Sequence, residues 1–92
     1  MLRTQAPTAD LCQGYVLRGR QRVALGMNGE PVNAQLRTVR VVMQRDLARR
    51  WLRDDPYGPL RWTLDDPQVS ICGVPIAFDE ALGPDEIELH YA

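Results

Sequence analysis

The alternating pattern over residues 86–91 constrains the fold more than any other stretch. Ile87, Leu89 and Tyr91 occupy every second position and are separated by glutamate and histidine. This period of two is typical of a strand with one buried face and one face in water. Because a single strand is not stable by itself, the pattern predicts a sheet in which this segment has partner strands.

A second apolar run, residues 69–78, predicts the partner strand. Its apolar parity shifts near Gly73, which indicates either a β-bulge or a strand covered on both faces. Pro75 has no N–H for a strand ladder, so we expect it on an edge or in a bulged register. Residues 79–85 are too many for a two-residue turn. We therefore expect 69–78 and 86–91 to form a hairpin with a wide loop.

The same stretch resembles a C-terminal pattern of small phage and prophage proteins. In that pattern a hydrophobic–Gly–hydrophobic–Pro strand leads to an acidic turn and a final short strand. The matching residues here are Ile71-Cys-Gly-Val-Pro-Ile76, Asp79, Leu82 and Glu86-Ile-Glu-Leu89. The resemblance covers roughly the last quarter of the chain. It implies a phage- or prophage-derived protein and carries no catalytic residues over to this chain.

Length and composition indicate one small soluble domain. The chain has 92 residues, of which 25% are charged, and this suits a single globular core. No apolar run approaches the ~20 residues of a membrane span, and the N-terminal segment lacks a signal-type apolar region, so we expect a cytoplasmic product. Cys12 and Cys72 are expected to be free, buried thiols. With a single histidine they give no metal-ligand spacing, so we expect neither a metal nor a cofactor.

The charges are distributed unevenly along the chain, although they sum to −1. Every basic residue is an arginine, and residues 1–53 contain ten arginines against three acids. Residues 54–92 contain one arginine against nine acids. This asymmetry indicates an anionic partner for the basic part. The alternative is that the two parts neutralise each other, within one chain or between two copies.

The N-terminal part is expected to be extended or irregular. Residues 1–10 are polar and aperiodic, which predicts a loose N-terminal segment. Residues 15–25 are expected to form one or two strands, in which alternate positions share a face. Three arginines occupy such positions: Arg18, Arg20 and Arg22. Asn28-Gly29 then predicts a turn, because both residues tolerate a positive φ.

Residues 33–53 admit two interpretations. The β-branched run 36–42 predicts a strand followed by a helix over 44–53, whereas apolar spacings of three and four residues also allow one continuous helix. We favour the strand and then the helix. Leu47 and Trp51 lie on the apolar stripe of that helix. The other side carries Arg45, Arg49, Arg50 and Arg53. A short strand is expected over 60–64.

The residue inventory argues against catalysis. A nucleophilic site would need a histidine, and His90 is expected to face solvent from a strand. The four pairs of adjacent acids lie in or beside Pro/Gly turns, where solvated carboxylates are common. The chain has no phosphate-binding, dinucleotide-binding or calcium-binding loop motif. We therefore expect that the protein is not an enzyme.

The sequence as a whole predicts one α+β domain over residues 1–92, a mostly antiparallel sheet with one helix packed on one face. We expect a non-enzymatic interaction or accessory protein that acts through protein–protein contacts, with self-association between the basic helix face and the acidic C-terminal strands. The alternative is a nucleic-acid-binding module, because arginine binds phosphate in bidentate fashion.

The candidate interaction surface combines these arginines with one aromatic residue. Trp51 and Trp62 are expected to pack in the core, whereas an exposed Tyr57 beside arginines would resemble an interface hot spot. The residues of this surface are Arg45, Arg49, Arg50, Arg53, Arg18, Arg20, Arg22 and Tyr57.

Overall fold

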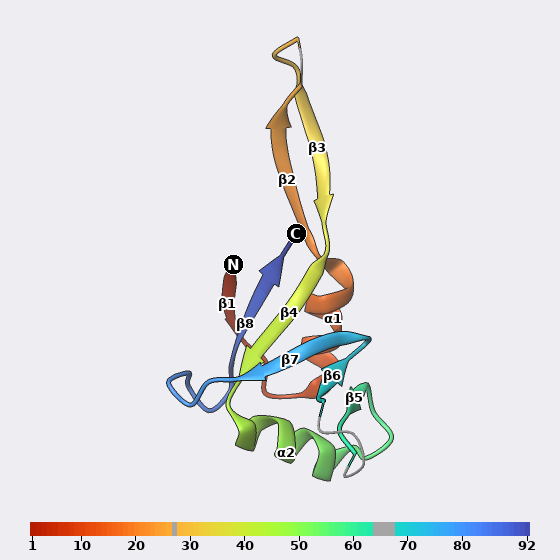
Figure 1. The fold of residues 1–92 in the computed structure, drawn as a ribbon, viewed down its shortest axis with the longest axis vertical. Helices are drawn as coiled ribbons and strands as arrows, with labels where there is room; N and C mark the ends of the chain where they lie inside the picture. Colours follow the sequence, from red (N-terminus) through yellow and green to blue (C-terminus); the bar gives the residue numbers. More distant parts are fainter. Residues whose placement is uncertain (27, 64–67) are drawn as a thin grey trace.

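The computed structural model describes residues 1–26, 28–63 and 68–92, and the side chains at 22–24, 32 and 33 lie outside the described part. The described residues form two helices and eight strands, arranged as Figure 1 shows. In chain order they are β1 (Leu2–Gln5), α1 (Ala9–Arg18), β2 (Arg20–Leu25), β3 (Pro31–Leu36), β4 (Thr38–Met43), α2 (Arg45–Asp54), β5 (Leu60–Arg61), β6 (Ser70–Ile71), β7 (Val74–Phe78) and β8 (Glu86–Tyr91).

The main sheet has the strand order β1-β8-β4-β7-β6-β5, so β4 lies between the two C-terminal strands. Val41 of β4 is opposite Leu89 of the antiparallel β8 and opposite Ile76 of the parallel β7. The expected hairpin of 69–78 with 86–91 is therefore wrong. The physical reason is burial. Val41, Val42 and Met43 are all buried, and a strand covered on both faces is favoured in the interior of a sheet.

The parity shift near Gly73 is a tight turn rather than the expected bulge. β6 and β7 form an antiparallel pair in which Ile71 is opposite Val74. The two residues between them have positive φ, 51° at Cys72 and 80° at Gly73, as in the two-residue turns that suit the twist of a hairpin. Pro75 precedes the residues of β7 that pair with β4, so its missing N–H interrupts no bond to that strand.

The expected loose N-terminal segment is wrong for residues 2–5. These residues form β1, which pairs antiparallel with β8 so that Leu2 is opposite Leu89. The outer edge of β8 offers unpaired backbone groups, and a salt bridge of 3.1 Å joins Arg3 Nε to Glu88 Oε2 across the pair. Backbone pairing at an open edge thus orders a segment that has no apolar periodicity of its own.

A helix, α1, replaces the strand expected to begin at Tyr15. The Leu11 N–H donates to the hydroxyl of Thr8, the N-cap residue, at 3.3 Å. Asp10 lies in the first turn, where a negative charge suits the helix dipole. The helix ends at Arg18, because Gly19 has a positive φ of 63°. The strand expected in this region is present only after Gly19, as β2.

The strand-then-helix interpretation of residues 33–53 is confirmed by β4 and α2. Leu47, Ala48 and Trp51 form the buried stripe of α2, as its spacing predicts. The Trp51 Nε1–H donates to the Pro7 carbonyl at 3.1 Å, which ties α2 to the segment before α1. Of the strand expected over 60–64, the described residues show only the two-residue β5, and residues 64–67 lie outside them.

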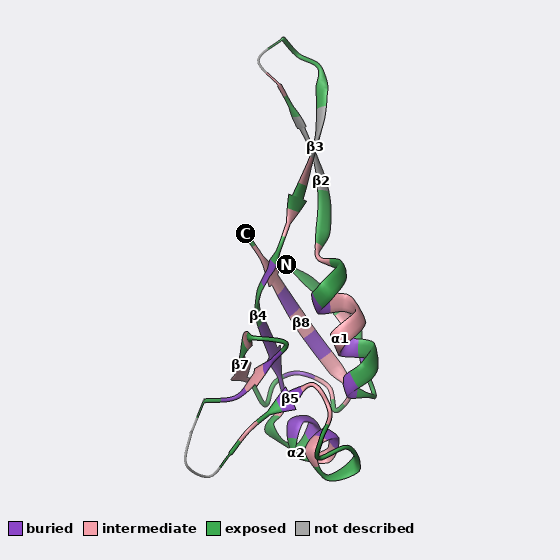
Figure 2. Ribbon diagram, turned by 90° about the vertical axis from the view of Figure 1, so that its right-hand side faces the viewer, coloured by how far each residue is buried: buried purple, intermediate pink, exposed green. Residues whose placement is uncertain are grey.

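The core lies between the main sheet and the two helices. Figure 2 shows the buried residues along β4, β8, α1 and α2. The alternation expected of the last strand is confirmed, since Ile87 and Leu89 are fully buried. The α+β fold class is also confirmed, with a mostly antiparallel sheet of six strands. The fold contains two helices rather than the one expected, because α1 and α2 both contribute buried residues to the core.

The strands β2 and β3 form a separate two-stranded sheet, which we call the projecting hairpin together with the turn between them. Figure 1 shows it extending away from the rest of the molecule, here called the body. The overall dimensions are 52 × 25 × 19 Å, and the hairpin accounts for much of the longest one. Its turn confirms the Asn28-Gly29 prediction: Gly29 has a φ of 76° and its N–H donates to the Gly26 carbonyl at 3.0 Å.

Candidate functional site

The root of the projecting hairpin is held in a fixed direction by close contacts. A Cβ atom at Gly19 would lie 2.3 Å from the Leu36 carbonyl oxygen, so only glycine allows β2 to start this close to the end of β3. The Gln35 side-chain amide donates to the Arg18 carbonyl at 2.9 Å. Just below, the buried Thr38 hydroxyl donates to the Val16 carbonyl at 3.1 Å. The hairpin is therefore anchored to the end of α1.

Beyond the root, the hairpin is exposed. None of its described side chains is buried, and Leu25 near the tip is 80% exposed. Within the described chain neither β2 nor β3 pairs with a further strand, so each has one free edge. A two-stranded hairpin is marginally stable alone in water, and free edges are common sites of pairing with another chain. An exposed leucine on such a hairpin indicates a contact surface.

Arginines surround the root of the hairpin, in an arrangement different from the one expected. Arg18 ends α1 and lies over the Tyr15 ring, with its Cζ 5.5 Å from the ring centroid, so it shares no strand face with Arg20. Arg22 lies in β2, and its side chain is outside the described part. Arg37, between β3 and β4, and Arg40, in β4, join the group. The exposed set, which we call the basic root, comprises Arg18, Arg20, Arg37 and Arg40.

A groove of ≈ 420 Å³ lies beside the basic root. We call it the root groove. It is bounded by the end of α1, the junction of β3 and β4, and the β6–β7 turn, and its lining includes Leu17, Leu36, Arg37, Val39, Cys72 and Val74. Two of its apolar side chains are unusually open to water, since Leu17 is 69% exposed and Val39 is 42% exposed. These segments are distant in the sequence, so no local pattern could have indicated the groove.

The four arginines predicted on α2 are largely engaged within the chain. Arg50 forms an ion pair with Asp85, and the Arg45 Cζ lies 5.0 Å from the centroid of the Phe78 ring. Arg49 and Arg53 make exposed 3.4 Å pairs with acids on the same helix, and such pairs contribute little to stability. The basic face of α2 is therefore partly neutralised by the acidic half of the same chain. This lowers its value as a contact surface.

Tyr57 is 98% exposed, on the loop between α2 and β5. The loop turns tightly, because the Gly58 N–H donates to the Asp55 carbonyl at 3.1 Å. A Cβ atom at Gly58 would lie 2.6 Å from the Asp55 carboxylate, so the turn leaves little room for a side chain there. Trp51 is buried and Trp62 packs on Phe78 with 5.4 Å between the ring centroids, so the expectation that tryptophans pack inside holds for both. Tyr57 stays a candidate contact residue, far along the chain from the hairpin.

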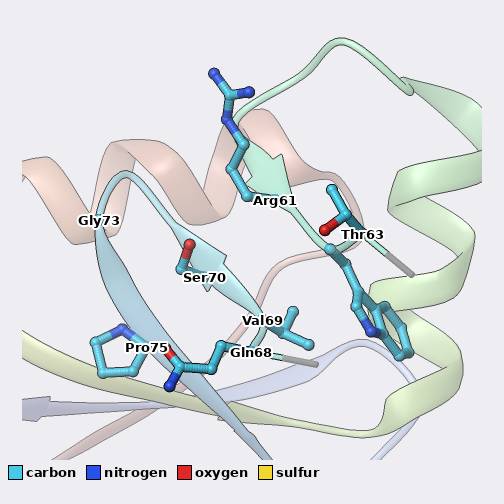
Figure 3. A pocket seen from close by; sticks show the side chains of 8 residues that line it. Arg61, Thr63, Gln68, Val69, Ser70, Gly73 and Pro75 are labelled. Carbon is cyan, nitrogen blue, oxygen red and sulfur yellow. The ribbon is translucent and has the colours of Figure 1, made fainter. Parts of the chain in front are cut away.

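A second hollow, of ≈ 490 Å³, lies between β5, β6 and β7. Arg61 is among its lining residues, and Figure 3 shows this side chain directed away from Pro75 and Gln68. Among its described lining residues there is no carboxylate, histidine or cysteine. Residues 64–67, which adjoin it, lie outside the described part. The described side chains therefore supply no acid–base chemistry here.

Three charged or titratable side chains, Arg3, Glu88 and His90, form a small surface network across β1 and β8. His90 Nε2 lies 2.6 Å from Glu88 Oε1, and Arg3 contacts the other oxygen of that carboxylate. Burial would raise the pKa of Glu88, but the hydrogen bonds from His90 and Arg3 outweigh it and hold that pKa below its usual value. His90 is half-buried beside this carboxylate, rather than fully open to solvent as expected.

The cysteines differ from each other in exposure. Cys12 is buried as expected, and burial, reinforced by the nearby charge of Cys72, raises the pKa of its thiol to about 12. Cys72 is exposed, which corrects the expectation that both are buried; it occupies a turn position and not a core position. Both are free thiols. No group of three or more metal-binding side chains occurs among the residues that the structure describes.

No helix in the described ranges is long and apolar enough to cross a membrane. Comparison with family models, with curated proteins and with solved structures finds no match to this chain.

Proposed function

We propose that this chain is a non-enzymatic protein that works through self-association, with the projecting hairpin as its contact element. The observation that carries the proposal is the exposed hairpin with an exposed leucine near its tip, which adds no buried side chain to the described core. The unpaired backbone N–H and C=O groups at each hairpin edge can form hydrogen bonds with strands of another chain. The 80% exposed Leu25 supplies an apolar contact. Origin as a phage- or prophage-type accessory protein is part of the same proposal and rests on the C-terminal resemblance.

The charge of the hairpin favours a protein partner over a nucleic acid. The hairpin, residues 20–36, contains two arginines, Arg20 and Arg22, and one acid, Glu30, so its net charge is only 2 − 1 = +1. A ribbon that enters a nucleic-acid groove gains most of its affinity from phosphate contacts, and these require a surplus of positive charge along the ribbon. A ribbon with so little net charge and an exposed leucine is better suited to a protein surface.

Sedimentation velocity over a range of protein concentrations tests the proposal. We expect the wild type to form a dimer and Leu25→Asp to shift it to monomer, because the new carboxylate would have to be desolvated in the contact. Leu11→Asp is the matched control, since Leu11 is an exposed leucine on α1 away from the hairpin. A wild type that stays monomeric at all concentrations would contradict the proposal, as would equal effects of the two variants.

Nucleic-acid binding is the second candidate, and the basic root is the observation that favours it. Among the described side chains, Arg20 and Arg37 are exposed and make no ion pair. Fluorescence anisotropy with labelled duplex and single-stranded oligonucleotides, at low and at moderate salt, separates the two candidates. Binding that weakens steeply with salt and is lost in Arg20→Ala/Arg37→Ala would favour the second. Absence of binding at low salt would leave self-association as the function.

A further inference from the structure

We propose that two copies pair through their projecting hairpins in an antiparallel, two-fold arrangement, with the tip of each hairpin in the root groove of the other copy. This inference rests on the proposed function, since it names the partner surface of the same hairpin. Three observations support it: the distribution of exposed apolar side chains, the distribution of charge, and the geometry of the hairpin.

The exposed apolar side chains occur at both ends of the hairpin. Leu25 is 80% exposed near the tip, whereas Leu17 and Val39, at 69% and 42% exposure, belong to the groove at the root. The tip and the root lie at opposite ends of the hairpin (Figure 1). Leu25, at the tip end of β2, therefore cannot reach the groove of its own chain. An antiparallel partner places its tip beside that groove, and both apolar sites are then removed from water.

The charges at the two ends are opposite in sign. Glu30 is an exposed carboxylate at the tip, and exposed Arg37 lies in the root groove. Two hairpins packed in the same direction would place one basic root against the other, so that up to eight exposed arginines would repel each other. Antiparallel packing separates the roots and brings Glu30 of each copy toward Arg37 of the other. Charge thus selects the antiparallel orientation.

The length of the hairpin agrees with this orientation. Six residues of β2 span roughly 20 Å at ~3.3 Å per residue. With full overlap the two basic roots lie about that far apart, which exceeds the Debye length of about 8 Å at physiological salt. The free edges of the two hairpins then run side by side. The two hairpins together form a sheet of four strands, and a sheet of three or more strands can be stable in water. The arrangement is closed by its two-fold axis, so it stops at a dimer.

Two kinds of variant test the inference by sedimentation equilibrium. Leu17→Asp changes the groove without touching the hairpin, and we expect it to raise the dimer Kd by roughly tenfold or more, as Leu25→Asp does. Leu11→Asp, on the same helix as Leu17 but outside the groove, should leave the Kd unchanged. Circular dichroism and the melting temperature establish that each variant is folded.

A charge exchange supplies the decisive comparison. Glu30→Arg and Arg37→Glu should each weaken the dimer by roughly tenfold, and the double variant should return the Kd to within about threefold of wild type, because both copies then carry the reversed pair. Additive losses in the double variant would overturn the inference.

The possible outcomes separate this inference from the proposed function. If Leu25→Asp abolishes the dimer while Leu17→Asp and the charge reversals leave it intact, the hairpin is the contact element but binds elsewhere, and only the inference fails. If the wild type is monomeric up to about 1 mM chain, both fail.

Discussion

The body and the projecting hairpin differ in how much apolar surface they bury. The body buries Met43, Ile87 and Leu89 completely between a six-stranded sheet and two helices. The described part of the hairpin buries no side chain and has two strands with free edges. Apolar burial therefore holds the body together, while the hairpin keeps apolar surface available for contact. Burial is thus concentrated in the body, and if the hairpin is the contact element as proposed, stability and contact can be changed separately.

The same substitution in the two regions should have the most unequal effects. Leu89→Ala removes a fully buried side chain from β8, and we expect a loss of about 2–5 kcal/mol in the free energy of unfolding from lost burial and the cavity left behind. Leu25→Ala removes an 80% exposed side chain and should change the same quantity by less than about 0.5 kcal/mol. Urea denaturation at low protein concentration measures both. Comparable losses would mean that the hairpin contributes to the core.

A glycine pair tests the connection between the two regions. Gly19→Ala introduces a methyl group 2.3 Å from the Leu36 carbonyl oxygen at a residue with positive φ, and we expect it to cost about 1–3 kcal/mol and to displace the hairpin. Gly14→Ala, in the middle of α1 with nothing within 4 Å of the added Cβ, should instead stabilise by about 0.5–1 kcal/mol. Thermal melts give the sign of each change. A neutral Gly19→Ala would show that the root is not fixed.

The smallest effect concerns the Glu88 network, which tests whether the edge of the body depends on charge. Because the pKa of Glu88 is lowered in the folded state, its contribution to stability is present above the unfolded value near 4.5 and is lost as the pH falls through the folded pKa. Glu88→Gln should cost at most about 1 kcal/mol at pH 7. Denaturation midpoints of variant and wild type should converge as the pH is lowered through the folded pKa of Glu88. A difference independent of pH would assign the effect to packing.

The sequence predicts the elements whose signals are local. The alternation of β8, the apolar stripe of α2 and the Asn28-Gly29 turn each depend on neighbours in the chain, and all three are present. The helix α1 was also open to prediction from Thr8 as N-cap and Gly19 as its end. Its mixture of polar and apolar residues instead favours a strand, because the alternate arginines after Tyr15 indicate a period of two.

Pairing between distant segments could not be predicted. The position of β4 between β7 and β8 depends on which of several apolar strands is buried on both faces, and no single stretch encodes that choice. The same limit applies to the site. Predicted Arg45 and Arg50 are engaged within the chain by Phe78 and Asp85. The root groove combines the end of α1 with the β6–β7 turn, and no local pattern in either segment indicates that the two lie together.

The place of β8 between β1 and β4 has a consequence for the order of folding. During synthesis the projecting hairpin, whose strands are joined by a short turn, can form within microseconds of its emergence. The main sheet cannot close until residues 86–91 have been made, because both β1 and β4 pair with them. We therefore expect the nascent chain to form the hairpin transiently before it has a stable body, and to hold it permanently only once the body is complete. If the hairpins pair as proposed, the hairpin of one nascent chain can pair with that of a neighbouring chain made on the same messenger RNA.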